Sequence, residues 1–143
     1  MSTFEIRFAE TDAEIARLFP VIRELRPHLK DADEFVARVR RQEHQGYRLI
    51  YVEDNGAPVA VAGFRLTEYL FAGLSLYVDD LICLESHRGR GFAAALMRWM
   101  EAHARERGCE TFHLDSGTQR QRAHHFYFRE GLSITSFHFV KKL

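Results

Sequence analysis

The chain has 143 residues, which is enough for one domain with a sizeable hydrophobic core and too few for two comfortable ones. Hydrophobic residues make up 46% and charged residues 28% of it, as in soluble globular proteins, and its 20 acidic residues balance its 20 lysines and arginines. No overall charge therefore draws it to nucleic acid or to a membrane surface, and we expect one domain over residues 1–143 with neither partner.

Cysteine use and the N-terminal residues indicate where such a chain would fold. Cys83 and Cys109 are the only cysteines, which is too few for a disulfide framework. The first ten residues, MSTFEIRFAE, carry no apolar signal core, and no later apolar run approaches the length of a membrane span. We expect a reducing, cytoplasmic setting.

The first third of the chain predicts a strand followed by two helices. Residues 4–8 alternate apolar and charged side chains, which indicates a strand. Thr11 and Glu14 form a capping box at the start of a helix, which Pro20 should kink or divide. A second helix is expected to begin near residue 33 and to end at Gly46.

The middle of the chain changes to the period of strands. Residues 47–54 and 57–66 predict two strands joined by the Asn-Gly turn at 55–56, the strongest short-range hairpin signal. Residues 68–73 are predicted to be an apolar connector, and residues 74–84 a long third strand.

The last third of the chain predicts a helix, a strand, a helix and a strand. The first helix follows two glycines, ends at Gly108, and has an apolar face made of Ala93, Leu96, Met97, Met100 and Ala104. Residues 111–115 predict a strand, residues 120–131 a helix and residues 134–140 a closing strand. The whole order predicts an α/β domain with a mixed, mostly antiparallel sheet flanked by helices.

The glycine-containing stretch HRGRGFAAAL, residues 87–96, is the strongest candidate for a ligand site. A glycine turn between a strand and a helix exposes unpaired backbone N–H groups at the positive end of the helix dipole, and such a turn binds anions. Glycine also lets a phosphate approach the backbone closely. The alternative is an ordinary glycine-rich turn.

Two familiar phosphate motifs fit this stretch poorly. The G-K-[ST] of a Walker loop is absent. Gly89, Gly91 and Ala94 spell a dinucleotide fingerprint, and the next strand ends in Asp115, which could meet a ribose. However, the preceding strand belongs to an antiparallel meander, and too few residues follow Asp115 for the remaining parallel strands. Nicotinamide dinucleotide binding is therefore disfavoured.

A third motif fits more of the chain. Residues 88–93 read R-x-x-G-x-A after the strand DDLICL, and residues 123–132, AHHFYFREGL, are similar to A-x-x-F-Y-x-x-x-G-F. Both patterns are signatures of the GNAT superfamily of N-acyltransferases. The order of predicted elements from residue 4 to residue 140 also resembles the order of elements in that family. The chain is therefore similar to the GNAT N-acetyltransferases.

The resemblance implies where acetyl-CoA, the co-substrate, would bind. The pyrophosphate would lie on the loop that starts at Arg88, on the backbone amides of Gly89, Arg90, Gly91, Phe92, Ala93 and Ala94. The pantetheine arm would pair with the strand backbone at Leu81, Ile82 and Cys83. Cys83 is expected to line the core or this arm rather than to act as a nucleophile.

The resemblance also assigns the catalytic groups. Tyr127 matches the family's acid, which would protonate the departing thiolate, although it could instead be a core aromatic. Asp79 is the first candidate for the base, with Asp80 second and Glu68 third, and strand alternation predicts that the two aspartates point to opposite faces. Arg120 stands where the family often has an asparagine that orients the cofactor arm.

The expected function is acetyl transfer to a primary amine of a small molecule or a peptide, by direct attack in a ternary complex. The family resemblance implies that the N-terminal helices and residues 67–73 line the acceptor side. A non-catalytic acyl-CoA-binding or sensor domain is the alternative, and a homodimer is possible. No metal is expected, because the adjacent His124 and His125 would point about 100° apart on a helix.

Overall fold

The computed structural model describes residues 4–143, and residues 1–3 of the expected domain lie outside the described residues. The chain divides into two compact units, one ending at His113 and one running from Leu114 to Leu143, which are described separately. The elements are β1 (Ile6–Phe8), α1 (Asp12–Ala16), α2 (Phe19–Leu25), α3 (Ala32–Glu43), β2 (Arg48–Asp54), β3 (Ala57–Tyr69), β4 (Gly73–Cys83), the 3₁₀ turn Glu85–His87, α4 (Phe92–Glu106), β5 (Thr111–Leu114) and α5 (Gln121–Arg129). Within residues 4–143, no helix is both long and apolar enough to span a bilayer.

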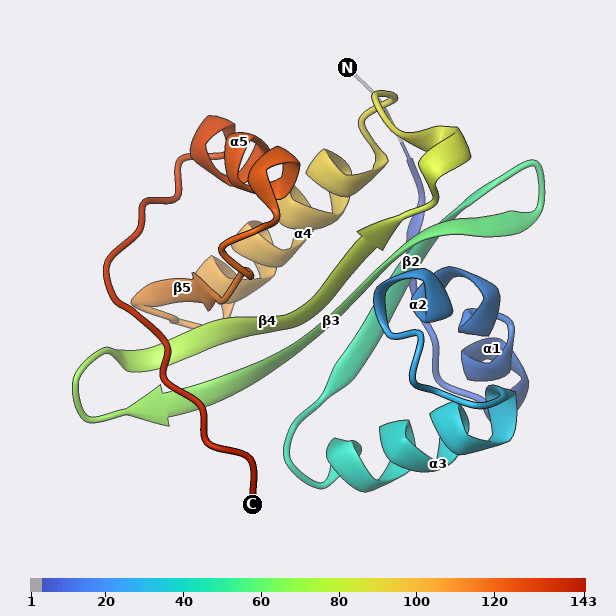
Figure 1. Cartoon of the computed structure of the whole chain (residues 1–143), viewed down its shortest axis with the longest axis horizontal. Helices are drawn as coiled ribbons and strands as arrows, with labels where there is room; N and C mark the ends of the chain where they lie inside the picture. Colours follow the sequence, from blue (N-terminus) through green and yellow to red (C-terminus); the bar gives the residue numbers. More distant parts are fainter. Residues whose placement is uncertain (1–3) are drawn as a thin grey trace. The chain divides into compact units, whose positions relative to one another are not determined.

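The strands form a five-stranded sheet in the order β1-β2-β3-β4-β5 (Figure 1). Strands β1 to β4 pair antiparallel with their neighbours, which confirms the predicted meander. Asn55 and Gly56 have φ angles of 52° and 80°, as the predicted hairpin turn requires. The predicted connector is wrong at its start: Glu68 and Tyr69 still belong to β3, because their backbones pair with Leu74 and Gly73 of β4.

The N-terminal helices follow from their capping residues. The Thr11 hydroxyl accepts a 3.1 Å hydrogen bond from the Glu14 amide, and the Glu14 carboxylate accepts a 2.9 Å bond from the Thr11 amide. This confirms the capping box. Pro20 lies in the first turn of α2, where its missing N–H costs no helical bond, so it divides the apolar run into α1 and α2 as predicted.

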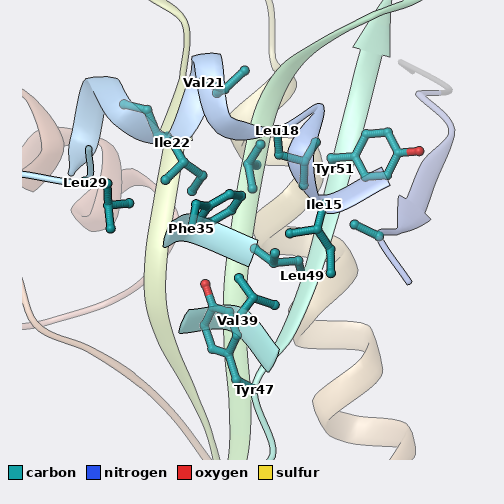
Figure 2. Close-up of a cluster of buried hydrophobic side chains, with 13 residues drawn as sticks. Ile15, Leu18, Val21, Ile22, Leu29, Phe35, Val39, Tyr47, Leu49 and Tyr51 are labelled. Atoms are coloured by element: carbon teal, nitrogen blue, oxygen red, sulfur yellow. The ribbon is translucent and has the colours of Figure 1, made fainter. Parts of the chain in front are cut away.

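The first unit has two layers of helices around the sheet (Figure 1). Helices α1, α2 and α3 cover one face, where Ile15, Ile22 and Phe35 pack in one buried cluster with Leu49 of β2 (Figure 2). Helix α4 packs on β2, β3 and β4. The predicted apolar face of α4 is confirmed, with Leu96, Met97, Met100 and Ala104 buried and Ala93 half-buried.

Glycine ends α4 where the sequence predicts. Gly108 has a φ of 77°, its amide bonds to the Arg105 carbonyl at 3.1 Å, and the Cys109 amide bonds to the Ala104 carbonyl at 2.9 Å. These two bonds are the Schellman pattern, which satisfies helical carbonyls that have no partner in the ladder.

The second unit contains α5 and a segment without regular structure. Gly131, with a φ of 90°, follows the C-cap of α5 as predicted. The predicted strand over residues 134–140 is wrong, because the structure assigns residues 132–143 to no helix or strand. Alternation shows which face a strand could bury, but a strand forms only where its backbone pairs with a neighbour.

Candidate active site

The glycine loop turns the chain from the end of β4 into α4. After the 3₁₀ turn, Arg88 is extended and exposed, Gly89 has a φ of 78°, and Gly91, the N-cap of α4, has a φ of 88°. Both glycines adopt a left-handed conformation that a side chain would strain. A Cβ at Gly89 would meet nothing within 4 Å, so the backbone there is open to a ligand.

The start of α4 supplies backbone donors beside this opening. The first helical bond joins the Ala95 amide to the Gly91 carbonyl at 3.0 Å, so the amides of Phe92, Ala93 and Ala94 precede the hydrogen-bond ladder. Phe92 anchors the turn because its side chain is buried. These residues fit a pyrophosphate, whose charge suits a helix N-terminus.

Contacts made by Arg90 and Phe92 hold the glycine loop in place. The Arg90 guanidinium lies 5.1 Å from the centre of the Phe92 ring and donates a 3.2 Å hydrogen bond to Asp54. The ring of Phe4 packs 4.4 Å from that of Phe92. The loop is therefore held against the β2–β3 turn and the N-terminal segment.

The strand before the loop places Leu81, Ile82 and Cys83 at its end, paired on one side with Ala62, Val61 and Ala60 of β3. At the other end of β4, hydrogen bonds reach the residues around β5: the Glu110 amide donates to the Leu74 carbonyl at 2.7 Å, and the Ser75 and Thr111 hydroxyls are 2.6 Å apart. Burial raises the pKa of the Cys83 thiol above its usual range, and Arg88 and Arg90 oppose this shift.

A β-bulge changes the expected direction of the two aspartates. Gly63 of β3 pairs with Asp80 and Phe64 pairs with Val78, so Asp79 is an extra residue in β4. Asp79 and Asp80 consequently line the same pocket. The prediction that they point to opposite faces is wrong, because strict alternation does not hold across a bulge.

Asp79 is held by an arginine of the neighbouring strand. Arg65 donates from Nε to Asp79 Oδ1 at 3.0 Å and from Nη2 to Oδ2 at 2.6 Å, a bidentate ion pair. Burial raises the pKa of the Asp79 carboxyl, and the Arg65 hydrogen bonds and charge oppose that rise.

Asp80 has two partners of different kinds. Arg26, just after α2, donates from Nε to Asp80 Oδ1 and from Nη2 to the Asp79 carbonyl, both at 2.9 Å. The Tyr47 hydroxyl donates to Asp80 Oδ2 at 2.6 Å. A Cβ at Gly63 would overlap this hydroxyl, so glycine leaves the space that Tyr47 occupies.

The aspartates line an open pocket of about 370 Å³ between α2, α3 and β4, to which the segment after α2 and Tyr47 also contribute. Its floor is apolar, with Ile22, Leu29, Phe35 and Val39, and its polar lining includes Arg26, His28, Arg38, Gln42, Tyr47, Tyr77, Asp79 and Asp80. Glu68 is exposed and pairs with Leu74, five pairs from the Gly63–Asp80 pair, or roughly 17 Å along the sheet. It is not among the lining residues.

Tyr127 lies on α5 in the second unit. Burial raises its pKa above the usual value near 10, and the Arg120 guanidinium beside the phenol opposes that rise. Arg120 is the N-cap of the same helix, so the residue that replaces the family's asparagine lies close to the candidate acid. On the same helix, His124 Nε2 lies 2.8 Å from the Gly117 carbonyl oxygen.

The sequence reasoning missed three residues that hold the aspartates, namely Arg26, Tyr47 and Arg65. No local pattern marks them, because each meets its partner through a contact between residues far apart in the sequence. Among residues 4–143, the structure contains no group of three or more histidine, cysteine or acidic side chains arranged to hold a metal ion.

Comparison with known proteins identifies the family. The sequence model of the Acetyltransferase (GNAT) family matches residues 12–131. An aminoalkylphosphonate N-acetyltransferase from Salmonella typhimurium is 29% identical over 147 residues, covering 100% of this chain and 94% of that protein. The mouse N-alpha-acetyltransferase 80 is 34% identical over 86 residues, covering 60% of this chain and 27% of that protein.

Solved structures share the fold. A putative acetyltransferase from Agrobacterium tumefaciens has a TM-score of 0.83 at 23% identity, with 97% of this chain and 99% of that one covered. The aminoglycoside N-acetyltransferase AAC(6')-Iy in complex with CoA has a TM-score of 0.84 at 15% identity, with 100% and 96% covered. Enzymes of the matched family use acetyl-CoA, and this chain belongs to the GNAT family of N-acetyltransferases.

Proposed function

We propose that the chain transfers the acetyl group of acetyl-CoA to the primary amine of a small molecule or a peptide, by direct attack in a ternary complex. The observation that carries this proposal is the arrangement along β4. The bulge at Asp79 opens onto a pocket, and the same strand leads, through Leu81 to Cys83, into the glycine loop. An acceptor pocket and a cofactor-binding segment are therefore consecutive on one strand.

The proposal assigns the coenzyme to the loop and the strand end. The pyrophosphate accepts hydrogen bonds from the amides of the loop, which are those of Gly89, Arg90, Gly91, Phe92, Ala93 and Ala94, with Arg88 at its entry. The pantetheine amides pair with the backbone of Leu81, Ile82 and Cys83. The open space at Gly89 and the free amides at the start of α4 support this assignment.

The chemistry requires one proton to leave the amine and one to reach the thiolate. The amine nitrogen forms a bond to the carbonyl carbon of the thioester, and the carbon–sulfur bond then breaks. In the proposal, Asp79 accepts the amine proton through water, with Asp80 as the second candidate, and Tyr127 donates its phenolic proton to the departing sulfur. The raised pKa of Tyr127 keeps the phenol protonated at neutral pH, which is the form that can donate, and its position must then bring it close to the sulfur.

The setting of the enzyme is also part of the proposal. Residues 1–143 form one N-acetyltransferase domain, supported by the family match, which crosses the boundary between the two units. A cytoplasmic location is supported by the two free thiols. A homodimer is supported by exposed apolar side chains in the C-terminal segment, such as Phe137 and Phe139. Calorimetric unfolding tests whether there is one domain, cell fractionation tests the location, and light scattering tests the homodimer.

Release of free CoA thiol from acetyl-CoA tests the function directly. A panel of amines and peptide N-termini is offered, including 2-aminoethylphosphonate because of the name of the Salmonella relative. The expected result is amine-dependent thiol release with acetylated product. Titration calorimetry with CoA and NAD is the companion measurement: CoA binding without turnover of any amine would favour the non-catalytic alternative, and NAD binding without CoA binding would contradict both.

A further inference from the structure

We propose that the pocket between α2, α3 and β4 binds an acceptor that carries an acidic group a few bonds from its amine, in other words a short zwitterion. The inference rests on the proposed function and adds the chemical class of the acceptor. It follows from how the charges of the pocket are already paired.

The two aspartates that line the pocket are already paired, so they have little capacity to bind a second ammonium group. Asp79 accepts two hydrogen bonds from Arg65, and Asp80 accepts one from Arg26 and one from Tyr47. An arginine therefore neutralises each carboxylate. These oxygens retain lone pairs that can orient one amine, but no unpaired carboxylate lines the described pocket to compensate a second positive charge.

The lining also contains cationic side chains that are more accessible than the aspartates. Arg26 uses two of its five N–H donors in the bonds to β4, and 42% of its side chain is exposed. Arg38 is 46% exposed, and its nearest carboxylate, Glu34 on the same helix, is 3.4 Å away. An exposed pair of this length is weak, so an incoming acidic group can replace Glu34. The exposed His28 adds a ring N–H donor.

The size and floor of the pocket suit a small acceptor. A volume of about 370 Å³ lies at the lower end of ligand pockets, and the floor of Leu29, Phe35 and Val39 suits a short alkyl linker. The amine would face Asp79 and Asp80, and the acid would face Arg38. A carboxylate and a phosphonate share this chemistry, since both accept paired hydrogen bonds from a guanidinium.

Three amines of similar length test the inference. 2-Aminoethylphosphonate carries an acid, propylamine an uncharged end and 1,3-diaminopropane a second amine. We expect kcat/KM for the phosphonate to exceed that for each of the others by about ten-fold or more, which corresponds to one charge-assisted hydrogen bond. β-Alanine extends the comparison to a carboxylate.

Arg38→Gln and Arg41→Gln form a matched pair of variants. Both arginines lie on α3, but Arg41 is not in the pocket lining. Arg38→Gln should raise KM for the phosphonate about ten-fold, with kcat and the constants for propylamine nearly unchanged. Arg41→Gln should leave the preference intact, and thermal unfolding checks that both variants fold.

The outcomes separate the two proposals. Equal use of the three amines, or equal behaviour of the two variants, would overturn the zwitterion inference while leaving the transferase intact. If no amine is acetylated, the proposed function fails. Calorimetry still decides the inference in that case: binding of 2-aminoethylphosphonate to the wild type that weakens in Arg38→Gln supports it, and absence of binding overturns it.

Discussion

The Tyr47 hydroxyl lies 2.6 Å from Asp80 Oδ2 and joins the start of β2 to the bulge of β4. Tyr47 is buried, so this bond to a carboxylate is shielded from water. Its environment raises the pKa of Tyr47 well above 10, mainly through burial and the charge of Asp80, so the phenol remains a donor throughout the physiological range.

Tyr47→Phe should lower the free energy of unfolding by about 1.5–3 kcal/mol, because it removes a buried hydrogen bond to a charged group without leaving a large cavity. Urea unfolding measures the change. Tyr69→Phe is the control, since that ring lies near the tip of the β3–β4 hairpin beside Phe71 and His113, and its loss should stay within about 0.5 kcal/mol. Equal losses in both variants would show that the Tyr47–Asp80 bond contributes little.

Gly89→Ala and Gly108→Ala separate backbone strain from coenzyme binding. The two glycines have φ angles of 78° and 77°, and neither has an atom within 4 Å of an added Cβ. Each alanine should therefore cost about 1 kcal/mol of stability or slightly more. Only Gly89→Ala should also weaken CoA binding in titration calorimetry, because its methyl group would lie where the pyrophosphate approaches. A similar CoA affinity in both variants would place the pyrophosphate elsewhere.

Tyr127→Phe should slow turnover by about ten-fold or more and leave acetyl-CoA affinity nearly unchanged. Because the pKa of Tyr127 is raised, the wild type should keep the protonated phenol to pH 10 and above. The pH profile of kcat/KM should accordingly rise as the acceptor amine loses its proton, with no decline up to about pH 10. An unchanged turnover in Tyr127→Phe would remove this residue from the acid role.

His103 should make folding sensitive to mild acid. Its ring stacks 5.0 Å from that of Trp99, and burial, aided by Arg107, lowers its pKa below the usual value near 6.5. The unfolded chain therefore takes up this proton at a higher pH than the folded chain. The stability due to the neutral ring is fully present above about pH 7 and is lost as the pH falls through the lowered pKa.

The His103→Phe variant keeps an aromatic ring on Trp99 and removes the titration. Its melting temperature should fall less than that of the wild type between pH 7.5 and pH 5. Identical falls in the two proteins would assign the acid sensitivity to other groups.

Most of the confirmed predictions about the fold depend on signals within a few neighbouring residues. The Thr11 capping box, the Asn55 turn and the glycine after α4 each satisfy nearby backbone groups, so a few adjacent residues suffice to predict them. The strand expected over residues 134–140 failed because pairing depends on a neighbour that no local pattern contains.

The candidate site was only partly predictable for the same reason. The glycine loop is a local motif, so the sequence alone places it between β4 and α4. By contrast, the partners of Asp79 and Asp80 come from residues 14 and 54 positions away along the chain, and the bulge appears only when β3 and β4 are aligned. A single sequence carries no signal for these contacts.

The bulge also divides β4 into two parts, in which side chains of opposite sequence parity face the pocket. Before it, the odd-numbered Tyr77 faces the pocket beside α2 and α3, whereas after it the even-numbered Asp80 lines that pocket and Ile82 joins the core of the same face. Straightening the strand with residue 79 still in place would exchange the sides of every later residue up to the glycine loop. Deleting residue 79 would instead remove the bulge and its carboxylate together, and would leave Asp80 opposite Gly63 on the pocket side. The bulge, rather than any one side chain, therefore sets which residues of the end of β4 face the pocket.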